Sequence, residues 1–397
     1  MTRSKTNSIS VLLIVDSYPP VLGGSEIEAQ RVSAGLIRRG HSVRVICAGG
    51  PPMPPVCDWV DPEGVPVTIL TRRSRGRWKD MIFAAGVAWS IWRGRKRYDV
   101  VYFLMQGLHL AAGLPVAHFL GKATVMKIAG STVIPLMRRS RAGRWELKWL
   151  QDWKVPVMVL NEGMMDEAIA DGFLREQLVW MPNPVDVDIF RPAGVAETAE
   201  WRRRHGIRGD ADVVIYVGRL SREKGLTGLL KGFAVASRKA PGAMLLLVGD
   251  GAMRGELEAL AEELKLRPEQ IRFIGRVPVN EVPFWLGASD VYALTSPNEG
   301  FPCALLEAMS AGLASVVSAI PANLQLVEQG VHGLTVPWDD SQAIGEAFLR
   351  LFGDPESRAK MGEAARRRVV ENYSTDRVVK YYEKVFADVM AAGINHN

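Results

Sequence analysis

The sequence predicts an α/β protein made of two Rossmann-like domains, and three observations predict it. The chain has 397 residues, more than one hydrophobic core usually serves. Short apolar runs rich in β-branched residues alternate with segments of helical spacing, as in folds whose parallel strands are joined by helices. This alternation begins near residue 11 and begins again near residue 213. Each half of the chain should therefore form its own sheet, with a cleft between the halves.

The first half opens with a strand, a helix and a second strand. We expect the strands at Val11–Val15 and Val43–Cys47, with a helix from about Glu26 to Arg39 that ends at Gly40. Gly is the usual residue just past a helix C-terminus. The opening is therefore that of a βαβ unit.

Two glycines, Gly23 and Gly24, lie between the first strand and its helix. Ser25 and Glu28 have the spacing of a capping box, which would place both glycines immediately before the helix N-terminus. Glycines there let a ligand approach the backbone closely. Such a pair is more often a plain turn, so the residues alone leave both interpretations open.

The second half repeats the pattern after a break. Strands are expected at 213–217, 244–248, 271–274 and 291–294, and helices near 226–238 and 253–264. The join falls at about 183–212, where prolines and a charged run interrupt the periodicity. We therefore expect a first domain over 1–187, a second over 188–370 and a final helical segment over 371–397.

Two carboxylates, Glu299 and Glu307, lie eight residues apart around a Gly-Phe-Pro turn. The turn follows the strand expected at 291–294, so Glu299 should lie in a strand-to-helix loop. Pro302 suits the first position of the next helix, and Gly312 suits its end. Glu307 follows about one turn into that helix. Helical side chains lean toward the N-terminus, so Glu307 can reach back toward the loop.

The start of this helix is expected to bind phosphate. The free backbone N–H groups of Phe301, Cys303 and Ala304 should point at the loop, and the helix dipole adds partial positive charge there. Carboxylates do not bind an anion, so Glu299 and Glu307 should address hydroxyl groups attached to it. The pattern predicts a phosphorylated sugar or a nucleotide. The competing interpretation is that both acids merely favour the helix dipole.

The segment from Glu299 to Glu307 resembles the E-x7-E motif of the retaining glycosyltransferases of family 4, which have the two-domain GT-B fold. Four further motifs occur in the family's order: Met181–Asp186, Val217–Gly225, Leu247–Gly251 and Phe273–Val277. The resemblance implies that the final helix crosses back to the first domain. It also implies a nucleoside-diphosphate sugar as donor and an acceptor hydroxyl, with no metal ion and no cofactor.

The resemblance also assigns roles to residues of the second domain. Arg219 and Lys224 would oppose the diphosphate and stabilise the charge that develops as it leaves. Glu307 would bind the ribose hydroxyls, and Glu299 would contact the donor sugar near its anomeric carbon.

Three other assignments follow from the same resemblance. Arg276 and Val277 would lie beside the nucleobase, and Gly23 and Gly24 near the diphosphate. The turn from Phe301 to Ala304, Pro302 included, would complete the donor site.

One position departs from the family pattern. Many members have a histidine near the donor sugar where this chain has Ala129. Lys127, Ser131 or His109 could take its place. A lone histidine such as His109 is more often a structural residue.

Positive charge is concentrated in the first half. Residues 72–97 hold nine Lys or Arg and one acid, and residues 138–154 hold six cations and two acids. Tryptophans accompany both segments. An uncharged helix, Met81–Trp92, separates the basic clusters of the first segment, which suits peripheral contact with an anionic membrane. The alternative is an ordinary buried helix of the first domain whose arginine-rich ends are exposed to solvent. We find no motif for nucleic-acid binding and expect none.

Composition agrees with a cytoplasmic protein. The three cysteines are odd in number and lack CxxC spacing, which argues against disulfides and structural zinc. No signal peptide and no membrane-spanning stretch is expected. We therefore expect a cytoplasmic retaining glycosyltransferase, active in surface polysaccharide or glycolipid synthesis and peripheral on the inner face of the membrane. The alternatives are a catalytically silent GT-B scaffold and, more weakly, a Rossmann dehydrogenase.

Overall fold

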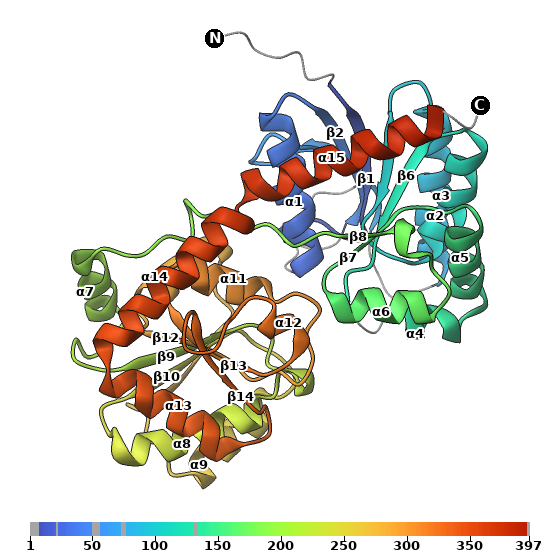
Figure 1. Ribbon diagram of the computed structural model, residues 1–397. Helices are drawn as coiled ribbons and strands as arrows, with labels where there is room; N and C mark the ends of the chain where they lie inside the picture. The colour runs from blue at the N-terminus through green and yellow to red at the C-terminus, as the bar shows by residue number, and fades with distance from the viewer. Residues whose placement is uncertain (1–7, 21–22, 50–55, 73–76, 131–132, 395–397) are drawn as a thin grey trace. The chain divides into compact units, whose positions relative to one another are not determined.

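The computed structural model describes residues 8–20, 23–49, 56–72, 77–130 and 133–394 (Figure 1). These residues form two compact units. Unit 1 holds the described residues up to Pro184 and those from Thr375 onward, and unit 2 runs from Val185 to Ser374. Each unit is built around one mainly or wholly parallel sheet covered by helices. The α/β class with two Rossmann-like domains is therefore confirmed.

The described part of unit 1 contains an eight-stranded sheet in the order β3-β4-β2-β1-β5-β6-β7-β8. Its strands are β1 (Ser10–Ile14), β2 (Ser42–Gly49), β3 (Cys57–Val60), β4 (Pro66–Arg72), β5 (Val100–Phe103), β6 (Ala123–Lys127), β7 (Val157–Val159) and β8 (Leu178–Trp180). Only the edge pair β3 and β4 is antiparallel. Central strands such as β1 and β5 are buried on both faces, which is why they read as continuous apolar runs.

The helices of unit 1 connect these strands and cover the sheet. They are α1 (Gly24–Arg38), α2 (Arg77–Arg93), α3 (Leu108–Phe119), α4 (Val133–Arg139), α5 (Arg141–Asp152), α6 (Glu162–Ala170), the 3-10 turn η1 (Arg175–Gln177) and α15 (Thr375–Ile394).

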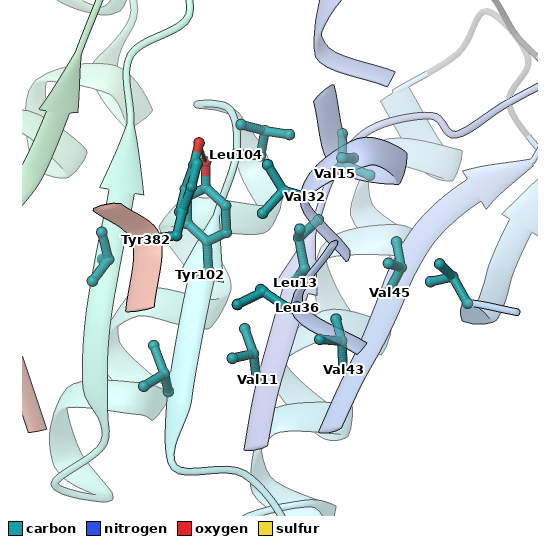
Figure 2. Packing of buried hydrophobic residues seen from close by; sticks show 14 of the residues in the cluster. Val11, Leu13, Val15, Val32, Leu36, Val43, Val45, Tyr102, Leu104 and Tyr382 are labelled. Carbon is teal, nitrogen blue, oxygen red and sulfur yellow. Dashed lines mark hydrogen bonds between the residues drawn. The ribbon is translucent and has the colours of Figure 1, made fainter. Parts of the chain in front are cut away.

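One face of the unit 1 sheet packs against α1 and α15. Val11 and Leu13 of β1 point to this face, where they meet Val32 and Leu36 of α1 (Figure 2). Tyr382 of α15 lies beside Tyr102 of β5, and their hydroxyl oxygens are 3.2 Å apart. Residues far apart in the chain thus share one core.

The C-terminal helix α15 is part of this core. A Cβ atom on Gly35 of α1 would come within 2.5 Å of Val379, so the two helices approach closely. Arg39 also donates a 2.6 Å hydrogen bond to Glu383. The expectation that the final helix packs on the first domain is confirmed.

The opposite face of the sheet packs against a layer of helices that includes α2, α3 and α5. Gly113 of α3 lies against Phe103 of β5 and Ile91 of α2, with about 3 Å between its virtual Cβ and each side chain. Figure 1 shows α2 and α3 side by side, with α5 next to them. The outward side of this layer is remote from the core around α1 and α15.

Unit 2 contains a six-stranded parallel sheet in the order β11-β10-β9-β12-β13-β14. Its strands are β9 (Val213–Val217), β10 (Met244–Val248), β11 (Ile271–Gly275), β12 (Val291–Leu294), β13 (Ala314–Ser318) and β14 (Gly333–Val336). Its helices are α7 (Val195–Arg204), η2 (Arg222–Lys224), α8 (Leu226–Lys239), α9 (Arg254–Glu263), η3 (Val279–Glu281), α10 (Val282–Gly287), α11 (Cys303–Ser310), α12 (Pro321–Leu324), α13 (Ser341–Gly353) and α14 (Pro355–Asn372).

Strand order fixes where each unit can bind a ligand. In unit 2 the chain leaves β9 toward β10 and β11, and later leaves β12 toward β13 and β14. The order therefore reverses between β9 and β12. In unit 1 it reverses between β1 and β5. Ligands of open α/β sheets bind at the carboxyl ends of the strands beside such a reversal.

Candidate donor site in unit 2

The loop after β9 carries the two cations expected at the diphosphate. Arg219 is exposed, two residues beyond the strand, and its backbone carbonyl accepts a 2.9 Å hydrogen bond from the Tyr216 hydroxyl. That bond ties the loop to the buried end of β9. Lys224 ends the short turn η2 and is half-buried. Both residues thus lie at the carboxyl end of β9, beside the reversal of strand order.

The loops after β10 and β11 are locked to the loop after β9 by backbone contacts. Gly249 follows β10 with a φ of +136°, and a Cβ atom there would lie 1.9 Å from the carbonyl oxygen of Gly218. Only glycine fits this position. Its N–H donates to the carbonyl of Gly275. Arg276 and Val277 come directly after that residue, so they lie at the same edge of the sheet.

The loop after β12 leads into α11, where the carboxylates lie. The helix begins at Cys303, one residue later than the sequence predicts, and Pro302 is its N-cap rather than its first residue. The cap makes no side-chain hydrogen bond. Phe301 is buried against Tyr373, with ring centroids 5.8 Å apart, which anchors the turn. Cys303 and Ala304 are half-buried at the first turn.

Lys224 and Glu299 form an ion pair that joins the loops after β9 and β12. The Nζ–Oε1 distance is 2.7 Å, and the side chains are 23% and 10% exposed. The pair therefore bridges the point where strand order reverses. Gly225 supports the same junction, because its carbonyl accepts a hydrogen bond from the hydroxyl of Thr295.

Glu307 lies near the same point. Tyr292 of β12 is fully buried, and its phenol pKa is raised, first by burial and then by the nearby charges of Glu299 and Glu307, among others. Both carboxylates therefore lie near the buried Tyr292 side chain. Glu307 itself is 8% exposed.

Cations without acidic partners complete the arrangement. Among the residues that the structure describes, neither Arg219 nor Arg276 lies within ion-pair distance of an Asp or Glu, and both side chains are exposed. Two free guanidinium groups and one lysine at the carboxyl ends of β9 and β11 favour an anionic ligand. Over the same described ranges, no group of three or more His, Cys, Asp or Glu side chains is placed to hold a metal ion.

The glycine pair of unit 1 differs in detail from the sequence prediction. Gly23 is the N-cap of α1 and Gly24 is its first residue, so only Gly23 precedes the helix, and no side chain caps it. The capping box is wrong. Glu28 is buried and its carboxylate is bound by Lys127 and by the Tyr382 hydroxyl. Burial of Glu28 against the sheet outweighs the local capping preference.

Two of the three proposed substitutes for the missing histidine can be placed. Lys127 is fully buried, paired with Glu28 and 3.0 Å from Asn183, so it is a core residue. His109 is 3% exposed, with its Nδ1 3.2 Å from Asp16 and its Nε2 3.2 Å from the Met105 carbonyl. Burial lowers the pKa of this imidazole. Ser131 lies outside the described residues.

Sequence reasoning missed two residues at the ligand-binding edges. Asp16 lies just beyond β1 and meets His109 in the first turn of α3, the helix that follows β5; strand order reverses between β1 and β5. The sequence offered one signal for Asp16, namely an acidic residue directly after the first predicted strand. Tyr292 looked like any strand residue, and only the nearby charges of Glu299 and Glu307, which together with burial raise its pKa, distinguish it.

Comparison with known proteins extends over most of the chain. Residues 22–189 match the family described as Glycosyltransferase Family 4, and residues 197–368 match the family described as glycosyl transferases group 1. An uncharacterised glycosyltransferase of Methanocaldococcus jannaschii is 24% identical over 96% of this chain and 99% of its own length.

A second relative matches over part of its length. A D-inositol 3-phosphate glycosyltransferase of Corynebacterium urealyticum is 32% identical, and the match covers 58% of this chain and 56% of that protein. The chain likewise spans about half the length of several other curated relatives.

Solved structures share the fold. The structure of Anabaena HepE in complex with UDP and glucose superposes with a TM-score of 0.78, covering 96% of this chain and 99% of HepE at 19% identity. The two family matches, the full-length relative and this shared fold agree with one another. The chain belongs to the family 4 type of glycosyltransferases and has their two-domain GT-B fold.

Proposed function

We propose that this glycosyltransferase moves a hexose-type sugar from a nucleoside-diphosphate sugar to an acceptor hydroxyl, with retention of anomeric configuration. The observation that carries the proposal is the Lys224–Glu299 pair at the strand-order reversal of unit 2, with Arg219 beside it. A carboxylate that can contact the sugar and cations that can contact the diphosphate thus lie together at the carboxyl ends of the unit 2 strands. HepE, which shares the fold, holds UDP and glucose.

The donor is proposed to lie across the carboxyl ends of β9, β11 and β12. Arg219 and Lys224 face the diphosphate, together with the N–H groups at the start of α11. Glu307 binds the ribose hydroxyls, and Arg276 and Val277 border the base. Fixed positive charge stabilises the nucleoside diphosphate as it leaves, which lowers the barrier without a metal ion.

The ion pair gives Lys224 a second role in this proposal. Without donor, Lys224 neutralises Glu299 at 2.7 Å. A diphosphate offers the ammonium group more negative charge than one carboxylate does. Lys224 then turns toward the phosphates, and Glu299 is left to stabilise positive charge near the anomeric carbon.

Gly23 and Gly24 are proposed to contribute from unit 1. Gly23 is the N-cap of α1 and Gly24 is its first residue, and this helix follows β1, beside which the order of strands reverses in that sheet. Backbone N–H groups at a helix start favour an anion. We assign them to the donor diphosphate.

The acceptor is proposed to be a carbohydrate or a lipid-linked saccharide, as in surface polysaccharide or glycolipid synthesis. The reaction is placed in the cytoplasm, at the inner face of the membrane. The basic, tryptophan-rich segments of unit 1 support this placement.

A panel of nucleotide sugars tests the donor assignment. The donor should raise the melting temperature of the wild-type protein and be hydrolysed or transferred, with product of unchanged anomeric configuration by NMR. Glu307→Gln should weaken nucleotide binding roughly 10- to 100-fold, because a charged acceptor loses hydrogen bonds worth about 1.5–3 kcal/mol. Glu262→Gln, an exposed acid of the same unit, is the matched control.

Arginine variants test the diphosphate contact. Arg219→Gln should lower donor affinity and turnover together, whereas Arg238→Gln, an exposed arginine on α8, should change neither. Wild-type donor affinity in the Arg219 variant would contradict the assignment.

A silent scaffold protein is the second candidate, because Ala129 stands where many relatives have histidine and Lys127 is committed to the core. It predicts nucleotide binding with no turnover of any donor in the panel. Measurable donor hydrolysis excludes it.

A further inference from the structure

The outward face of α2 carries large apolar side chains that none of the described residues of unit 1 covers. Five of them are 45–78% exposed: Trp78, Met81, Ile82, Trp89 and Trp92. Their spacing places them along one side of the helix. The other side, with Phe83, Val87 and Ile91, is buried against the unit. The helix is therefore apolar on both sides, and among the described residues only one of these sides is packed against the rest of unit 1.

The neighbouring helices extend this apolar face. Phe119 at the end of α3 is 81% exposed, and His118 beside it stacks on Trp153, with ring centroids 4.0 Å apart. Trp153 caps α5 and stacks in turn on Trp149, while Trp145 of α5 is 55% exposed.

The fold thus gathers two tryptophan segments that are far apart in the sequence. Six of the eleven tryptophans of the chain lie on α2, on α5 or at the end of α5. α3 contacts both α2 and α5 and lies between them. We call this outward side of α2, α3 and α5 the tryptophan face.

Positive charge borders the tryptophan face. Arg93 ends α2, Arg95, Lys96 and Arg97 follow it, and all four side chains are exposed. Among the described residues, no Asp or Glu lies within ion-pair distance of these four. Arg95 also stacks on Trp92 at 4.8 Å. Residues 72–97 and 138–154 carry net charges of +8 and +4, so the rest of the chain sums to −6.

We infer that the tryptophan face docks on the surface of an anionic lipid bilayer. Tryptophan rings prefer the headgroup level, and unpaired cations are attracted to anionic lipid over about a Debye length. The face lies on the outer sides of helices, so it suits a flat surface. In the described residues no helix has the length and apolarity needed to cross a bilayer. Contact is therefore interfacial.

Membrane docking adds to the proposed function. Only the suggestion that the acceptor is lipid-linked rests on that function. A transferase held at the bilayer by unit 1 meets acceptors confined to the membrane. Binding to lipid itself needs no donor and no turnover, so the two claims can fail separately.

Vesicle sedimentation of the full chain tests whether the exposed cations contribute to lipid binding. The protein should sediment with phosphatidylcholine vesicles that contain phosphatidylglycerol, much less with phosphatidylcholine alone, and less in high salt. The variant with Arg95→Gln, Lys96→Gln and Arg97→Gln should partition on the order of 100-fold more weakly. The control with Lys231→Gln, Arg238→Gln and Lys239→Gln removes the same charge from exposed cations of α8 and should bind like wild type.

Tryptophan variants test the apolar contact. Trp89→Ser should weaken partition at least tenfold, whereas Trp338→Ser, a similarly exposed tryptophan of unit 2, should not. Equal loss in test and control variants, or equal binding to neutral vesicles, overturns the inference. So does sedimentation equilibrium in which Trp89→Ser dissociates a dimer while vesicle binding stays unchanged. Donor hydrolysis, measured without vesicles, should be the same in all these variants.

Discussion

Lys127 and Glu28 form a buried ion pair in unit 1, and replacing Lys127 should expose how much the core depends on it. The two side chains are 0% and 2% exposed, so Lys127→Met leaves a carboxylate without its cation in a dry site. Glu28 retains the Tyr382 hydroxyl at 2.6 Å. Removing one partner of a buried pair costs about 3–5 kcal/mol.

A neutral double variant isolates the pair. Glu28→Gln combined with Lys127→Met has no buried charge and should recover most of the lost free energy of unfolding. The double-mutant cycle then gives a favourable coupling free energy, because the two single losses together exceed the loss in the double variant.

Hydrogen exchange is the suitable assay, because two units make a single unfolding free energy ill-defined. Slowly exchanging amides of β1, β5 and β6 should exchange roughly 150- to 5,000-fold faster in Lys127→Met, the equivalent of 3–5 kcal/mol. Peptides from unit 2 serve as the internal control. A change below fivefold in unit 1, or a double variant as unstable as the sum of the singles, would refute the reasoning.

Turnover of the double variant separates structure from catalysis. If Lys127 replaced the family histidine at the donor sugar, both variants would lose activity. We expect the double variant to keep near wild-type turnover, since Lys127 is a core residue.

Two more predictions concern single positions. Burial raises the pKa of Glu146 to about 7 in the folded protein, above its ordinary 4.5. The folded state therefore holds the proton more tightly, and this contribution to stability is lost as pH rises from 4.5 to 7. Glu146→Gln should remove this pH dependence of the free energy of unfolding. The stability of the variant relative to wild type should be about 3 kcal/mol higher at pH 8 than at pH 4, measured by hydrogen exchange of unit 1. Gly249→Ala should destabilise unit 2 by more than about 2 kcal/mol, through backbone strain and the 1.9 Å clash of the new Cβ atom with the Gly218 carbonyl oxygen. The control Gly255→Ala, in open space on α9, should be neutral or stabilising. Equal melting temperatures of these two alanine variants would contradict the clash.

Four of the six described strands of unit 2 were predictable from local pattern alone, whereas β13 and β14 were not predicted. β9, β10 and β12 begin and end where the sequence predicts, because each is a short apolar run between turn residues. Helix starts were less predictable. The capping box at Ser25 failed since Glu28 finds Lys127, a partner 99 residues away.

The candidate site was predictable in composition but not in its contacts. The spacing of Glu299 and Glu307, and the order of the motifs around Arg219 and Lys224, are properties of the sequence. The direct pairing of Lys224 with Glu299, 75 residues apart, follows from strand order, which local periodicity does not encode.

The sequence by itself determined the α/β class, the two Rossmann-like domains and the family, because short-range periodicity and ordered motifs carry that information. Only the tertiary structure decided that Lys127 is a core residue and that Tyr292 lies near both carboxylates. It also joined the tryptophans of α2 and α5 into one face through α3. The physical reason is the same in each case: burial and pairing depend on neighbours that the chain brings together only when its sheets form.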